Sequence, residues 1–215
     1  MPTDNAPTPA DRTALLLKMY DQMFNDINRH IAVLWQSVTV LAGAFAVFGL
    51  VEKNVLPIDY ACALLVLIAA WHLAHVYDAS YWYNRNLVII ANIERQFLTS
   101  SDLANIQYYF GEHRKNLSML THLRIQWWLG IGIGGLIIAY HALSRIVCAP
   151  LSLSEVTRLL PYAVGLGAVF LLWLLRRSRA RSYENFLKNS PGKAVDTTDI
   201  VYGAGHPAEP PTEHP

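Results

Sequence analysis

The chain has 215 residues, of which 53% are hydrophobic and 15% are charged, and its formal net charge is +1. Average soluble proteins carry about 25% charged residues. The deficit is concentrated in four long apolar blocks, which leave too few residues for a large soluble domain. The near-zero net charge argues against a nucleic-acid binder, which normally presents a basic face. The sequence contains no P-loop, glycine-rich dinucleotide fingerprint or CxxC pair.

Residues 1–10 are polar and rich in proline, and we expect them to be largely disordered. They lack the basic region and apolar core of a signal peptide. A helix is predicted to begin with Thr8 as N-cap, Pro9 in the first turn and Asp11 near the positive end of the dipole. An amphipathic stripe follows at steps of three or four residues or their multiples, made of Leu16, Tyr20, Met23, Ile27 and Leu34. This helix is expected to continue into the first membrane span, residues 31–51.

A short turn at residues 52–54 leads to Pro57 and to a second long helix over residues 58–98. Its first half has the roughly 20 apolar residues that cross a hydrocarbon core. Its second half keeps apolar residues at helical spacing among polar ones, and neither Pro nor Gly interrupts the run. We therefore predict one helix that leaves the bilayer and continues into water.

The second half of the chain repeats this arrangement. After a break at residues 99–102, we expect a short amphipathic piece over residues 103–110 that ends at Gly111. A helix from about Glu112, with leucines on one face, would enter the third span at residues 127–147. The fourth span is predicted at residues 159–175, followed by a basic amphipathic helix to residue 188. Residues 189–215 are expected to form a disordered tail.

The placement of Lys and Arg predicts the orientation, since these residues are enriched in cytoplasmic loops. The two loops within the predicted hairpins hold only Lys53, Arg145 and Arg158 of the 17. We therefore expect both termini and the central segment to be cytoplasmic, in a bacterial inner membrane. The predicted fold class is an all-α integral membrane protein with four transmembrane helices in two hairpins, 11–98 and 99–188, whose helices extend into the cytoplasm.

The cytoplasmic extensions carry apolar stripes that cannot stay exposed to water alone. The stripe on the second helix comprises Trp82, Ile89, Ile93 and Phe97. We expect these residues to form an assembly face that packs within the subunit, against other copies, or both. A homo-oligomer embedded in a lipid bilayer is the resulting prediction.

Two groups of polar residues lie near the predicted spans. His72, His75 and Asp78 are low-probability metal ligands, because a metal site needs three or four convergent ligands. The simpler reading is that the histidines are hydrogen-bonded inside the bundle. Asp59 is read as an acid at a helix N-terminus, and His141 lies within the third span. We predict no metal, no cofactor and no enzymatic activity; a membrane enzyme that uses the histidines is the third alternative.

Small residues in the third and fourth spans predict close helix contacts, since helices in lipid associate by packing. The residues are Gly130, Gly134 and Gly165. The partner can be another span of the same chain or a neighbouring subunit. A basic cluster after the fourth span is predicted to bind lipid head groups, and comprises Arg176, Arg177, Arg179 and Arg181. A disulfide between Cys62 and Cys148 is a minor alternative to two free thiols.

One family resemblance accompanies this layout. The segment from Tyr81 to Asn86 (YWYNRN) and the segment from Asn92 to Phe97 (NIERQF) resemble the small prokaryotic membrane proteins grouped as SMODS- and SLOG-associating effectors. The resemblance implies transmembrane hairpins with cytoplasmic helix extensions. It also implies a pore-forming or membrane-perturbing role in defence against phage, with a soluble sensor partner or a diffusible signal as trigger. The alternative is a non-conducting anchor that recruits a soluble partner through its cytoplasmic helices.

Overall fold

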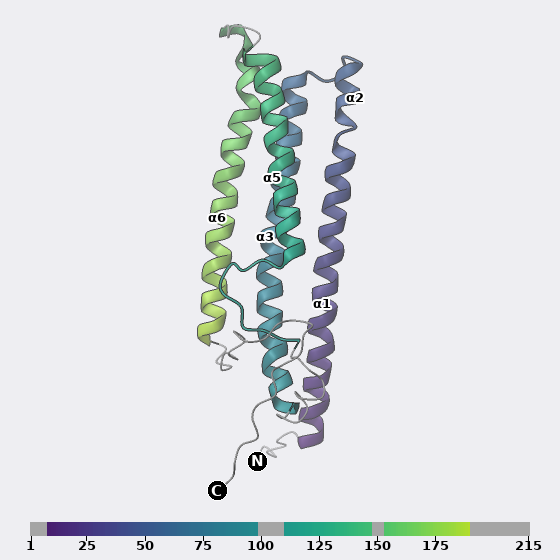
Figure 1. Cartoon of the computed structure of the whole chain (residues 1–215), viewed down its shortest axis with the longest axis vertical. Coiled ribbons are helices and arrows are strands. Elements are labelled where there is room, and N and C mark those ends of the chain that lie inside the picture. Colours follow the sequence, from purple (N-terminus) through teal and green to yellow (C-terminus); the bar gives the residue numbers. More distant parts are fainter. Residues whose placement is uncertain (1–7, 99–109, 148–152, 190–215) are drawn as a thin grey trace, which may run out of the picture. The chain divides into compact units, whose positions relative to one another are not determined.

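The computed structural model of the chain describes residues 8–98, 110–147 and 153–189, and these residues form helices and connections without any strand. The elements, in chain order, are α1 (Pro9–Ala44), α2 (Val47–Glu52), α3 (Ile58–Phe97), α5 (Thr121–His141), a π-helical turn η1 (Ala142–Val147), a 3₁₀ helix η2 (Leu153–Leu159) and α6 (Leu160–Asn189) (Figure 1). Within the described ranges, four helical stretches are long and apolar enough to cross a membrane. The prediction of an all-helical chain with four such stretches is confirmed.

The chain divides into two compact units, each made of segments that are separated in sequence. Of the described residues, unit 1 comprises 8–29, 82–98, 110–118 and 183–189, and unit 2 comprises 30–81, 119–147 and 153–182. Each unit therefore takes segments from both halves of the sequence.

The start of α1 agrees with the predicted cap. The backbone N–H of Asp11 donates to the Thr8 hydroxyl oxygen at 3.2 Å, and the Thr8 N–H and hydroxyl donate to the Asp11 carboxylate at 3.1 and 2.6 Å. This reciprocal pair satisfies donors that the helix cannot satisfy itself. The hydrogen bonds lower the pKa of the Asp11 carboxyl.

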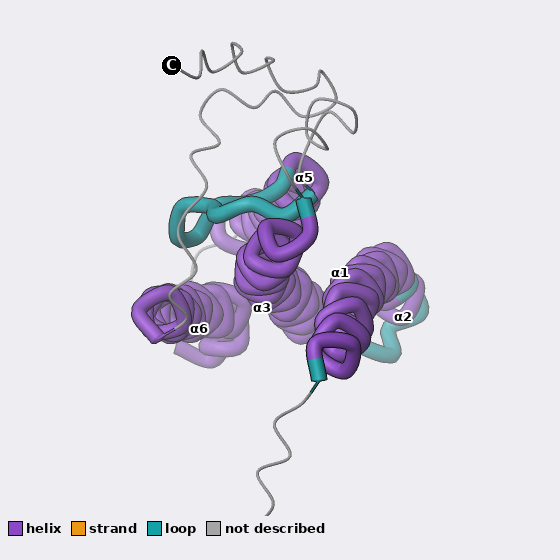
Figure 2. Tube along the Cα trace, turned by 90° about the horizontal axis from the view of Figure 1, so that it is seen from below, coloured by secondary structure: helices purple, strands orange, loops and turns teal. Residues whose placement is uncertain are grey.

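In unit 2, α3 is the enclosed helix. Half of its most apolar 18-residue stretch is buried, compared with 22%, 17% and 11% of the corresponding stretches in the other three candidate spans. Figure 2 shows α3 between α1 and α6. Its residues Cys62, Leu65 and Val66 form a core with Ala44 of α1 and Ile137 of α5. The unit is thus organised around α3, and the other helices pack against it.

Two of the predicted membrane helices change their geometry locally, in ways that the sequence did not predict. The first apolar block is not one helix, because α1 ends at Ala44 and α2 begins at Val47 after a turn at Phe45 and Ala46. The third block begins at Thr121 and its last turn widens into the π-helical η1. Apolar composition alone does not locate such local changes in helix geometry.

The largest correction concerns residues 112–120, where a helix was predicted. These residues are irregular, and Leu117 has a positive φ of 60°. In unit 1 their backbone groups bond to other elements: the Glu112 N–H donates to the Leu87 carbonyl at 3.1 Å, and the Tyr183 hydroxyl donates to the Arg114 carbonyl at 2.9 Å. These long-range bonds replace the intrahelical ones that the leucine spacing suggested. The predicted piece at residues 103–110 lies outside the described residues except for Phe110, as do the tail from residue 190 and Cys148.

Candidate functional site

A buried polar cluster in unit 2 centres on Asp59, at the start of α3. Asp59 is 3% exposed and His141 is fully buried. Oδ1 of Asp59 accepts hydrogen bonds from Nε2 of His141 and from Nε of Arg145, both at 3.1 Å. Oδ2 accepts from the Thr157 hydroxyl at 3.2 Å. One carboxylate therefore joins α3, α5, η1 and η2.

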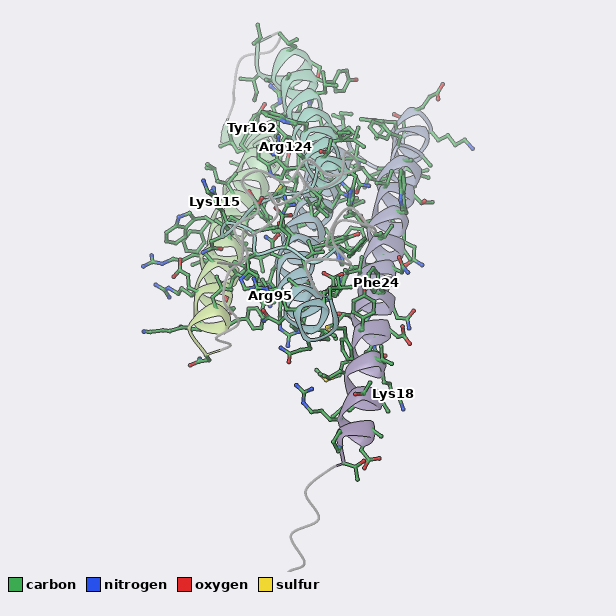
Figure 3. The ribbon with its side chains drawn as sticks, turned by 60° about the horizontal axis from the view of Figure 1, so that its bottom comes forward. Lys18, Phe24, Arg95, Lys115, Arg124 and Tyr162 are labelled. Carbon is green, nitrogen blue, oxygen red and sulfur yellow. The ribbon has the colours of Figure 1, made fainter. Side chains whose placement is uncertain are left out.

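The chemistry of these groups fixes how the cluster is protonated. A carboxylate only accepts hydrogen bonds, so Nε2 of His141 carries the proton that it shares with Asp59. The other ring nitrogen, Nδ1, lies 3.0 Å from the hydroxyl of Tyr162 on α6. Figure 3 labels Tyr162. The result is a chain of acid, imidazole and phenol inside a unit with a largely apolar core. Sequence reasoning took Asp59 for a simple helix-terminal acid, although the i, i+4 pair His141 and Arg145 was a signal of a polar face.

The predicted metal candidates do not come together. Nε2 of His72 donates to the Gln126 carbonyl at 3.1 Å, and Nδ1 lies 2.9 Å from the Ser37 hydroxyl. His75 instead packs its ring edge-on against Trp71, with the ring centroids 4.5 Å apart. Asp78 forms an ion pair with Arg179. Within the described ranges, no group of three or more His, Cys, Asp or Glu side chains is placed to hold a metal ion. The histidines serve hydrogen bonding and packing.

The predicted packing glycines all lie at contacts within unit 2. A Cβ placed at Gly130 would lie 2.8 Å from Leu73 Cδ2 and 2.9 Å from His72 Cδ2. A Cβ at Gly134 would lie 3.6 Å from Ala69 Cβ, and one at Gly165 would lie 3.8 Å from Val66 Cγ1. These three glycines therefore let α5 and α6 approach α3. By contrast, a Cβ at Gly132, Gly135 or Gly167 would meet nothing within 4 Å.

The predicted assembly face lies in unit 1 and is partly used inside the chain. Ile93 is buried and Phe97 is 40% exposed, whereas Trp82 and Ile89 are intermediate. Trp82 also receives a cation–π contact from Arg85, whose guanidinium carbon lies 5.2 Å from the ring centroid. Contact of these residues with other copies stays a prediction.

The predicted basic cluster is on α6 in unit 2. The guanidinium carbon of Arg177 lies 5.4 Å from the ring centroid of Trp173, and that of Arg179 lies 4.9 Å from the ring centroid of Tyr81. Arg176 and Arg181 are exposed. Binding to lipid head groups stays a prediction.

Unit 1 contains a cavity of about 470 Å³. Its aromatic walls are Tyr20, Phe24, Phe97 and Phe110, and its remaining lining residues are Leu17, Ile93, Glu94 and Leu98. Figure 3 labels Phe24 on the side of α1 that faces α3. Phe24 packs against Phe110 with the two rings tilted and their centroids 4.4 Å apart. The cavity is therefore apolar apart from one carboxylate and one phenol.

Glu94 is 6% exposed at this cavity, and sequence reasoning treated it as a salt-bridge former. Its carboxylate accepts hydrogen bonds from the Tyr20 hydroxyl at 3.1 Å and from the backbone N–H groups of Phe110 and Gly111 at 3.1 and 2.8 Å. Glu94 lies beyond residues 58–77, the apolar stretch that we expect to cross the bilayer. Burial raises the pKa of this carboxyl, although the three hydrogen bonds act in the opposite direction. No sequence signal could have found this carboxylate, since its donors come from α1 and from the loop at residues 110 and 111.

His113 gives unit 1 a testable dependence on pH. Its Nε2 lies 3.2 Å from Asn92 Oδ1, and burial, together with the charge of Arg95, lowers its pKa below the ordinary 6.5. The unfolded chain therefore binds a proton more readily than the folded one, so folding stability falls as the pH decreases from 6.5 through the lowered pKa. We expect the free energy of unfolding in detergent to fall more steeply over this range for the wild type than for His113→Gln. Parallel pH curves for the two proteins would contradict this assignment.

Comparison of the chain with protein-family models, with curated proteins and with solved structures finds no match.

Proposed function

We propose that this chain is a homo-oligomeric, multi-pass protein of the bacterial inner membrane, with both termini cytoplasmic, and that it acts as a pore-forming or membrane-perturbing effector in defence. The four apolar helices and the Lys and Arg distribution support the membrane location. The resemblance of residues 81–86 and 92–97 to SMODS- and SLOG-associating effectors supports the role in defence.

The observation that supports the proposed oligomer is that the glycines of α5 and α6 fall into two sets, those at contacts inside the unit and those on an open face. Gly130, Gly134 and Gly165 are used inside unit 2, whereas Gly132 and Gly135 of α5 lie on an open face. Large apolar side chains surround these open positions, including Trp128, Leu136 and Tyr140. Lipid can cover such a face, but an open small residue also permits the close backbone approach that favours helix association in a bilayer. The α5 face is therefore where a second copy would dock.

The polar interior of unit 2 suggests how an assembly would perturb the bilayer. Asp59, His141 and Tyr162 are held in one hydrogen-bonded chain. Ionisable groups at membrane depth are costly and are commonly found on ion pathways. A change in helix packing between copies would expose these groups to a shared, wetted path.

The test compares the same substitution at two open glycines. Gly132→Leu is expected to leave the chain folded and to weaken self-association about tenfold, or about 1.4 kcal/mol. Gly43→Leu on α1 is the matched control, because a Cβ there also meets nothing within 4 Å. The measurements are the mass of the assembly in mild detergent and the membrane potential of cells that express the chain alone or with its genomic neighbour.

The two measurements separate the parts of the proposal. Loss of both the assembly and the depolarisation in Gly132→Leu, with Gly43→Leu like the wild type, would support it. A monomeric wild type, or an unchanged membrane potential under all expression conditions, would refute it.

A non-conducting anchor is the second candidate, and one observation favours it. On the part of α1 in unit 1, Leu15 and Met19 are 59% and 39% exposed, one helical turn apart. An exposed apolar pair on a helix is a common site for a soluble partner. In this case Leu15→Ser and Met19→Ser together should abolish co-purification of a partner while membrane insertion persists, and the wild type should not depolarise cells.

A further inference from the structure

The cavity in unit 1 combines a ligand-sized volume with a single buried charge. Its volume of about 470 Å³ lies within the range of about 300–1,000 Å³ that is typical of small-molecule sites. Such sites are mostly apolar and carry a few polar groups that orient the ligand. Here the polar groups are the Glu94 carboxylate and the Tyr20 hydroxyl.

Among the described residues, the carboxylate of Glu94 is hydrogen-bonded but has no cationic partner. Its donors there are a neutral hydroxyl and two backbone N–H groups. Within this part of the chain, two of these donors reach Oε1 and one reaches Oε2, which leaves Oε2 able to accept a further contact. A buried carboxylate without a counter-charge is unfavourable, and a cation placed beside it would lower this cost.

The rings that surround Glu94 suit the same type of ligand. Four aromatic side chains line the cavity with this acid, and Phe97 and Phe110 are partly exposed at 40% and 38%. Aromatic faces attract organic cations, with about 0.5–2 kcal/mol for each favourable contact. An anion would be repelled by Glu94, and a neutral apolar ligand would leave the carboxylate uncompensated.

We propose that this cavity binds a small organic cation of the alkylammonium or benzylammonium class, with the charged nitrogen beside Glu94 and the apolar groups against Phe97 and the neighbouring rings. This binding does not depend on the proposed pore, since it is measured on the purified protein rather than by conductance.

The probe is radiolabelled benzyltrimethylammonium, measured by equilibrium dialysis at pH 8 against the purified full chain in a non-ionic detergent, with empty micelles as blank. The wild type should bind it saturably. Glu94→Gln keeps the shape of the side chain and removes its charge, so binding should weaken at least tenfold. Phe97→Leu keeps an apolar side chain and removes the aromatic face, so binding should weaken about threefold.

Glu184→Gln is the matched control. Glu184 is an exposed acid of the same unit that accepts a hydrogen bond from Asn116 at 2.9 Å and does not line the cavity. This variant should bind like the wild type.

Competition with neopentylbenzene, a neutral molecule of the same shape, keeps the test decisive if Glu94→Gln does not fold. The neutral molecule should fail to displace the probe at equal concentration. Absence of saturable binding to the wild type, equal binding by a folded Glu94→Gln variant, or equal displacement by the neutral molecule would each overturn the proposal.

Discussion

Gly111→Ala is expected to destabilise unit 1 by about 3 kcal/mol. A Cβ at this position would lie 2.0 Å from the backbone nitrogen of Ala91, 2.4 Å from its Cα and 2.7 Å from its Cβ. These are atoms of α3 that cannot move without distorting the helix, so the loop would have to withdraw. Withdrawal would also break the hydrogen bond from the Gly111 N–H to Glu94 at 2.8 Å. Thermal unfolding in detergent and proteolysis of residues 112–118 would measure the effect.

Gly167→Ala is the control for this prediction. Its Cβ meets nothing within 4 Å, and replacing Gly by Ala within a helix typically stabilises by up to about 1 kcal/mol. The two variants should therefore change the free energy of unfolding in opposite directions. A Gly111→Ala protein that melts like the wild type would show that the loop does not lie against Ala91.

Asp59→Asn is expected to destabilise unit 2 by about 3 kcal/mol, because it removes the only carboxylate in contact with His141 and Arg145 among the ion pairs of the described residues. The new amide would also turn N–H donors toward groups that already donate hydrogen bonds. Chemical denaturation in detergent, followed by tryptophan fluorescence, would measure the loss.

Asp78→Asn is the matched control for Asp59→Asn. Asp78 also pairs with an arginine, Arg179, but both side chains are 31% exposed. Exposed pairs contribute about 0–1 kcal/mol. If the two variants lost equal stability, the cluster around Asp59 would not be the buried network described above.

The helices of this chain are largely predictable from sequence because apolar spacing is a local property. Uninterrupted apolar and amphipathic periods gave α3 as one helix, and it spans Ile58–Phe97. The prediction of a helix at residues 112–120 was wrong for a physical reason. Its leucines have helical spacing, but the side chains of Asn84 and Tyr183 bind its carbonyls, and the backbone follows those distant partners.

The candidate sites were less predictable, because they depend on which helices meet. The spacing of Gly130 and Gly134 indicates a close contact, but only the fold shows that α3 is the neighbour and that Gly132 is left open. In the same way, the residue type of Glu94 suggests an ion pair. Its hydrogen bonds to the backbone of residues 110 and 111 exist only because the loop returns to α3.

The uneven burial of the candidate spans has a consequence for how this protein can evolve. A side chain on α3 is surrounded by neighbours, so exchanging it for another apolar type changes a fitted contact. On α6, where 11% of the most apolar stretch is buried, Leu, Val, Ile and Phe should replace one another freely. Among descendants of this gene, the residue identities of α6 should change quickly while its positions stay apolar. On α3, both the residue identities and their apolar character should change little.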